Sequence, residues 1–144
     1  MNVPRYKHSS CSLHDRIYVV CGINVDGDEL KSIEFIGIRA GSTGAVLFVQ
    51  KTWTKCDPDG LTPSRDGVLV APIGESELLV YGGCDHKDNV LAEGIVYNII
   101  TKKTIKRVEQ QEYSIISRCN GYWMKEGHAI ALVNVGNFTH TVVY

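Results

Sequence analysis

The chain contains an internal repeat, which constrains its fold more than any single motif does. Three segments each carry an arginine at or near the start, followed by an apolar stretch: residues 4–22, 63–83 and 117–135. The arginines, Arg5, Arg65 and Arg118, are 60 and 53 residues apart. This spacing predicts a tandem array of similar structural units.

Short β-forming runs make up each unit. Residues rich in Val, Ile, Leu and Tyr are bounded by Gly, Asp, Asn and Pro, which is typical of strands and turns. The sequence predicts strands near residues 9–13, 17–21, 32–38, 45–53, 68–73, 77–81, 94–99, 104–108, 122–125, 129–133 and 139–144. No longer stretch has a helical apolar period, so we expect almost no helix.

A pair of glycines follows the second strand of the second unit, as Gly82-Gly83. The first unit has Cys21-Gly22 at this place, and the third departs from the pattern with Asn134-Val135. A sharp turn beside the packed centre requires a positive φ or a missing Cβ, which glycine supplies. An aromatic residue lies in the third strand of each unit: Phe35, Tyr97 or Tyr144. Trp53 precedes the second unit.

These residues resemble the kelch family, and the resemblance covers essentially the whole chain. It implies an all-β fold of kelch-type β-propeller blades, about three four-stranded antiparallel blades with the third incomplete. We expect blade one at about residues 3–61, blade two at 62–112 and a partial blade three at 113–144. We also expect Trp53 to pack between blades, where large rings contribute most.

Three units cannot close a propeller ring, which takes about four to eight blades. We therefore expect the remaining blades to come from a longer polypeptide or, as the alternative, from a second subunit. Either way, the outward faces of the first and third blades are expected to be bare apolar surfaces.

The repeated arginines are candidates for partner binding, with Arg65 foremost. Arg5, Arg65 and Arg118 precede the innermost strand of each unit. The kelch resemblance implies that such positions converge at the channel mouth and grip acidic peptides, because arginine binds carboxylates in a bidentate manner. The alternative is that each arginine pairs with a neighbouring carboxylate or carbonyl and only ties the blades together.

Two polar loops after the second strands are further candidates, because loops on a rigid scaffold commonly carry recognition. We expect them to lie together on one face, although a solvated hairpin remains the alternative. The candidate partner-binding residues in these loops are Asn24, Asp26, Asp28, Asp85, His86, Lys87, Asp88 and Asn89.

Catalytic and cofactor motifs are not found in the sequence. It has no Gly-x-Ser-x-Gly elbow, phosphate-binding glycine loop or four-ligand zinc pattern. We therefore expect no enzyme activity, no cofactor and no bound metal. The five cysteines, an odd number without tight pairing, are expected to be reduced, small core residues. A net charge of −1 offers no basic field for nucleic acid or a membrane surface.

The sequence thus predicts a non-catalytic protein–protein interaction module, acting as a scaffold or adaptor within a larger assembly. Its partner would be another protein or a peptide, with an acidic peptide as one form. A cytoplasmic location is expected, with the cytoskeleton as one setting. The alternative is a small-molecule- or sugar-binding propeller enzyme, which would need a convergent polar pocket at the channel mouth.

Overall fold

The computed structural model describes residues 1–40, 46–48, 52–56, 61, 66–87, 89, 91, 93–108, 119–125, 128–135 and 138–143. For residues 40, 46–48 and those after 105, the description covers the backbone alone. This part of the chain is all-β, and no helix occurs in it.

Three antiparallel sheets are formed by strands that are consecutive along the chain. The first sheet contains β1 (Ser9–Leu13), β2 (Arg16–Val20), β3 (Ile33–Ala40), β4 (Val46–Phe48) and β5 (Thr54–Lys55). The second contains β6 (Leu69–Pro72), β7 (Glu77–Tyr81), β8 (Gly94–Asn98) and β9 (Lys103–Val108). The third contains β10 (Cys119–Lys125), β11 (His128–Val135) and β12 (Phe138–Val143).

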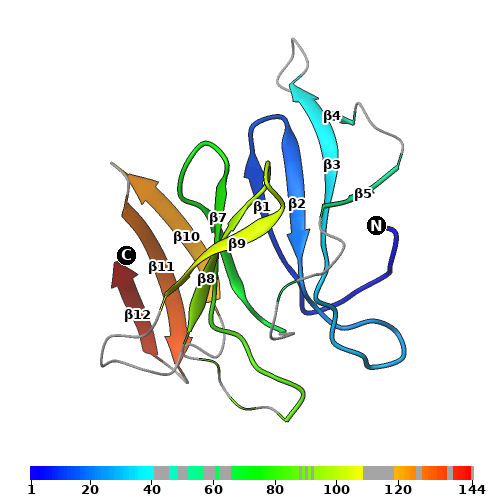
Figure 1. Cartoon of the computed structure of the whole chain (residues 1–144). Coiled ribbons are helices and arrows are strands. Elements are labelled where there is room, and N and C mark those ends of the chain that lie inside the picture. The colour runs from blue at the N-terminus through cyan, green and yellow to red at the C-terminus, as the bar shows by residue number, and fades with distance from the viewer. Residues whose placement is uncertain are drawn as a thin grey trace.

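The sheets stand side by side in chain order (Figure 1). The leading strands are neighbours, because β6 contacts both β1 and β10. Backbone bonding joins the first two sheets directly: the amide of Gly67 donates to the carbonyl of Lys7 at 3.0 Å. Within the described residues these sheets form an open array and do not close a ring.

The predicted strand at residues 45–53 is wrong in one respect. The outer edge of β3 is shared by two short strands, with β4 beside Ile38–Ala40 and β5 beside Glu34 and Phe35. Strand propensity indicates which residues fit a pleated sheet, but it does not specify the register in which they pair. It therefore could not predict that β4 and β5 pair with different parts of β3. The ten other predicted strands are found, with boundaries shifted by at most a few residues.

The main core lies between the first and second sheets. Its members are apolar and nearly all fully buried: Cys11, Tyr18, Val20, Cys21, Ile33, Cys56, Leu61, Val68, Val70, Leu78, Val80, Ile95 and Tyr97. On the other face of the second sheet, Leu79 and Val96 form a separate buried cluster. The second sheet is therefore buried on both faces, which explains why Leu78, Leu79 and Val80 in β7 form a continuous apolar run instead of alternating with polar residues.

Trp53 does not fill the interface between the first two sheets, so this prediction is wrong. Its side chain is only partly buried, and it lies outside the core cluster. Cys56 and Leu61 take this place, at 2% and 0% exposure. Both are fixed through their backbone amides, because Cys56 donates to the carbonyl of Ile33 and Leu61 to that of Lys31, each at 2.7 Å.

The prediction that the outward face of the first blade is a bare apolar surface is also wrong, because the described apolar residues on this face are covered. Val19 and Ile36 alternate with core residues and so point away from the core cluster, yet they are 4% and 6% exposed. Val19 lies directly opposite Glu34 in the sheet, so the two share a face. Asn2 and Arg5 hydrogen-bond to Glu34, and the N-terminal segment thereby covers this side of the sheet.

The repeat seen in the sequence is reproduced in the hydrogen bonds. Leu30 donates its amide to the carbonyl of Gly22 at 2.7 Å, and Leu91 donates to that of Gly83 at 2.8 Å. The glycine pairs have the positive φ expected of them: 68° at Gly82 and 87° at Gly83, with 58° at Cys21 and 96° at Gly22. The first two units are therefore equivalent structures.

We predict that Gly22→Ala destabilises the fold more than Gly27→Ala does. Both glycines have φ near +90°, so an alanine carries a similar backbone strain, of order 1–3 kcal/mol, at either place. A Cβ at Gly22 would meet the Tyr6 carbonyl oxygen at 2.7 Å, whereas nothing lies within 4 Å at Gly27. Urea unfolding measures the difference, and equal losses would contradict the close approach at Gly22.

We predict that Leu61→Ala costs about 2–5 kcal/mol of unfolding free energy, the usual range for a buried leucine. Trp53→Ala is expected to cost less despite removing a larger side chain, because that ring is only partly buried. Thermal and urea unfolding of the two variants test this ranking. A larger loss of unfolding free energy for Trp53→Ala than for Leu61→Ala would indicate that the tryptophan is the main contact between units.

Candidate functional site

The two polar loops have the same internal architecture. In the first, the side-chain oxygen Oδ1 of Asn24 accepts from the amides of Asp26 and Asp28, at 2.9 and 2.8 Å. In the second, Oδ1 of Asp85 accepts from the amides of Lys87 and Asn89, at 2.8 and 2.9 Å. Asn and Asp close turns in this way because their short side chains reach backbone amides two residues on.

A second side-chain bond locks each loop, with the two residue types exchanged. Asn24 donates from Nδ2 to Oδ2 of Asp28 at 3.1 Å, and Asn89 donates from Nδ2 to Oδ2 of Asp85 at 3.0 Å. Each loop therefore contains one amide–carboxylate pair, reversed in chain order. These four side chains hold the loops in shape.

The described residues between the locking pairs face solvent. Val25 is 80% exposed, and Asp26, His86 and Lys87 are exposed as well. An apolar side chain this open at a loop tip is a candidate contact for a partner. Val25 is not among the residues predicted from the sequence, because its place between locking residues is visible only from the hydrogen bonds.

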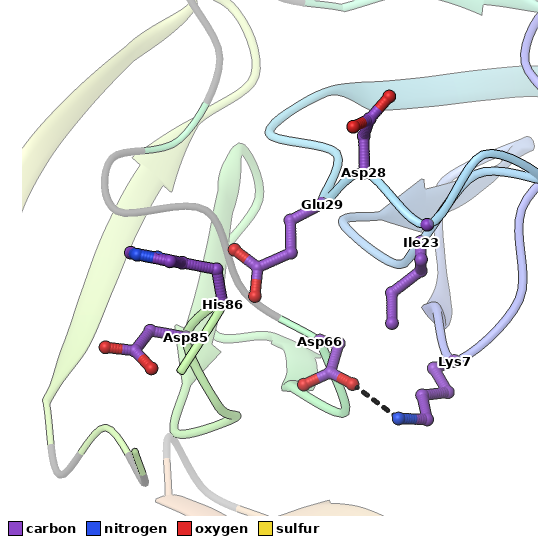
Figure 2. Close-up of a pocket in the computed structure, with 8 residues that line it drawn as sticks. Lys7, Ile23, Asp28, Glu29, Asp66, Asp85 and His86 are labelled. Atoms are coloured by element: carbon purple, nitrogen blue, oxygen red, sulfur yellow. Dashed lines mark ion pairs between the residues drawn. The ribbon is translucent and has the colours of Figure 1, made fainter. Parts of the chain in front are cut away.

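The two loops border a single hollow of about 430 Å³, which confirms that they lie together on one face (Figure 2). Eight residues line it: Lys7, Ile23, Gly27, Asp28, Glu29, Asp66, Asp85 and His86. Glu29 and His86 enter it from opposite loops (Figure 2).

Lys7 and Asp66 link the two repeats across the hollow. The Nζ of Lys7 lies 3.0 Å from Oδ2 of Asp66, and their side chains are 52% and 11% exposed. Neither residue was predicted from the sequence as part of the site. Their position follows from topology, because the start of an innermost strand lies at the same end of a sheet as the exit of its antiparallel neighbour.

The lining of the hollow is predominantly acidic. Asp28, Glu29, Asp66 and Asp85 provide four carboxyl groups, while Lys7 and His86 provide the basic groups. Hydrogen bonds from Asn89 and from the Lys87 amide hold the pKa of Asp85 below its usual value, so it is a carboxylate at neutral pH. The arrangement suits a cationic group better than an anionic one.

Arg5 lies apart from this hollow and is fully buried. Its guanidinium donates to the Cys21 and Ser32 carbonyls at 2.9 and 3.1 Å, and to Ser32 Oγ at 2.9 Å. It also forms an ion pair with Glu34. With its side chain 0% exposed, Arg5 presents no surface to a partner in this structure and fits the alternative interpretation, that of a tie within the repeat.

The other sequence-based candidates have mixed outcomes. Arg65, Arg118 and Asp88 lie outside the described residues. Cys11, Cys21 and Cys56 are buried thiols, which confirms them as core residues, whereas Cys84 is only partly buried. Burial raises the pKa of Cys11 to about 12, so this thiol remains protonated. In the part of the chain that the structure describes, no His, Cys, Asp and Glu cluster is arranged to hold a metal ion, and no helix is suited to crossing a membrane.

The sequence matches no protein-family model, and no curated protein has significant similarity to it. The kelch-type interpretation therefore rests on the residues and hydrogen bonds of the chain itself.

We predict that the second loop responds to acid through Asp85. A carboxyl whose pKa is lowered by folding stabilises the folded form above its unfolded-state pKa, and this contribution is lost as pH falls through the lowered value. The amide resonances of Lys87 and Asn89 should therefore shift at a pH below the ordinary aspartate range.

The control variant is Asp85→Asn, which places at this position the residue type that the first loop has at Asn24. It should keep the loop geometry and abolish the shift in NMR titration. Titration of the two amides at an ordinary carboxyl pKa would contradict the hydrogen bonding described here.

Proposed function

We propose that the chain is a segment of a kelch-type β-propeller that binds another protein on the face bordered by its two polar loops. In this proposal it acts as a non-catalytic scaffold or adaptor in a larger assembly. The remaining blades come from a longer polypeptide or from a second subunit. The proposed setting is the cytoplasm, in keeping with the buried thiols of Cys11, Cys21 and Cys56.

The repeat geometry supports the propeller. Two successive units have the same strand order, the same left-handed turn after the second strand and equivalent hydrogen bonds beyond it. The leading strands of the three sheets are neighbours, as expected for innermost strands around a common axis. A sheet buried on both faces, as the second one is, fits a blade between two others.

The observation that carries the functional proposal is the convergence of equivalent loops from two repeats on one hollow. Each loop is locked by its own Asn–Asp pair. Binding therefore costs little conformational entropy in these loops. Exposed Val25 and the hollow beside it offer one apolar and one polar contact region.

The charge of the hollow indicates the character of the bound segment. The expectation of an acidic peptide depended on three arginines, of which Arg5 is buried in an ion pair. Around the hollow, Asp85 is a carboxylate and Glu29 enters from the other loop. We therefore propose that a lysine or arginine of the partner enters here, beside an apolar residue that contacts Val25.

The proposal predicts that short labelled peptides containing arginine and leucine bind the full chain more tightly than matched neutral peptides containing glutamine and leucine. Glu29→Gln should weaken this binding about three- to tenfold, because one charge–charge contact of about 1 kcal/mol is removed. Fluorescence anisotropy measures the affinity, and added salt should weaken it.

The matched control is Glu75→Gln, the same substitution at an exposed residue in the hairpin at the opposite end of the second sheet. It should leave the affinity unchanged. Equal effects of the two substitutions, or no preference for the basic peptides, would contradict binding at the hollow.

A further inference from the structure

A second surface, on the outer strand of the second sheet, has the opposite charge. Four cationic residues occur within six positions there: Lys102, Lys103, Lys106 and Arg107. The whole chain has a net charge of only −1, so this run is a strong local excess. It lies along β9, which pairs with β8 alone among the described strands.

The described side chains of this surface are exposed and include large apolar ones. Residues 101–105 are all exposed, with Ile105 at 51% and Ile100, in the preceding turn, at 76%. Oδ1 of Asn98 accepts from the amides of Ile100 and Thr101 at 3.0 and 2.9 Å. The turn that presents Ile100 is therefore held in one conformation.

An irregularity in β9 marks Ile105. The partners of β8 step from Lys106, opposite Val96, to Thr104, opposite Tyr97, and leave Ile105 as the extra residue of a β-bulge. Bulges at sheet edges redirect a side chain and are designed features of a strand. Here the extra residue is an exposed isoleucine next to the lysines.

Protection of the sheet edge explains only part of this surface. Lysines and bulges on an edge strand oppose pairing with other strands, including the same strand of a second copy. Protection does not explain Ile100 and Ile105, since exposed isoleucines beside an edge promote association. Exposed apolar residues beside cations are typical of a recognition surface whose charge selects among partners.

We propose that the surface formed by residues 100–105 binds an acidic protein segment that also carries apolar side chains. Its carboxylates pair with the exposed Lys102 and Lys103, and its apolar side chains cover Ile100 and Ile105. The cations would then select for acidic segments and against basic or neutral ones. This surface is separate from the loop face, so the proposal does not depend on the proposed function.

The composition of the run favours a protein over a nucleic acid or a membrane. Residues 100–107 contain no aromatic side chain on which a base could stack. Exposed isoleucines gain nothing from a phosphate backbone, which is bound through charge. Stable binding to a membrane surface requires more than one anchoring signal. This short run, with four cations and two isoleucines, provides only one.

The test measures binding of the full chain to three labelled probes: a peptide of glutamates interspersed with leucines, its glutamate–serine counterpart, and a lysine–leucine peptide. We expect the glutamate–leucine peptide to bind more tightly than its glutamate–serine counterpart. Lys103→Glu should weaken binding of the glutamate–leucine peptide about tenfold, since attraction is replaced by repulsion. Ile105→Thr, which keeps the β-branched shape, should weaken it about threefold. Lys103→Glu should not weaken binding of the lysine–leucine peptide, which the carboxylates of the loop hollow attract.

Two control variants separate this surface from others. Lys55→Glu makes the same charge change on the exposed edge strand β5 and should have no effect. Glu29→Gln, in the loop hollow, should also leave this binding intact, so that failure here and failure of the proposed function are distinguishable.

Equal binding of the glutamate–serine peptide, or equal losses for Lys55→Glu and Lys103→Glu, would overturn the proposal. Tighter binding to single-stranded oligonucleotides or to vesicles containing phosphatidylserine, lost in Lys103→Glu, would also overturn it and assign the surface to that class of ligand instead.

Discussion

The buried guanidinium of Arg5 is the contact on which the first repeat depends. It bonds to the carbonyl of Cys21, where β2 ends in a left-handed turn, and to Ser32, just before β3 begins. The same side chain pairs with Glu34 inside the sheet. One residue thus fixes both ends of the first polar loop and draws the N-terminal segment over the outer face of the sheet. An unpaired charge left at this depth would be costly, so these groups form a unit.

The sequence predicted the periodic features of the fold well. The repeat, the strands and the positive φ of the glycine pairs follow from local residue preferences, which operate within a few residues. The first two units are equivalent in hydrogen bonding, as their sequences indicate. Features that depend on contacts between distant segments were less accessible. Trp53 is an example, since its partial burial is set by Cys56 and Leu61 turning inward after β5.

The candidate site shows the same limit. The two loops were found from the sequence, because a polar run after an apolar strand is a local signal. Arg5, the candidate arginine of the first unit, is buried and paired, and an ion pair with Glu34, 29 positions away, has no local signature. Lys7 and Asp66 were missed for a related reason. They reach the hollow only because antiparallel pairing brings the start of one strand beside the end of the next.

The exchanged Asn and Asp residues of the two loops have an evolutionary consequence. Either order of amide and carboxylate closes the same turn, with nearly the same bond lengths. Such a loop tolerates relocation of its negative charge from one end to the other while its backbone is preserved. A lineage of such repeats has a route to altered ligand preference that does not pass through a misfolded intermediate. The position of the charge in the loop can therefore change under selection while the backbone of the loop stays constant.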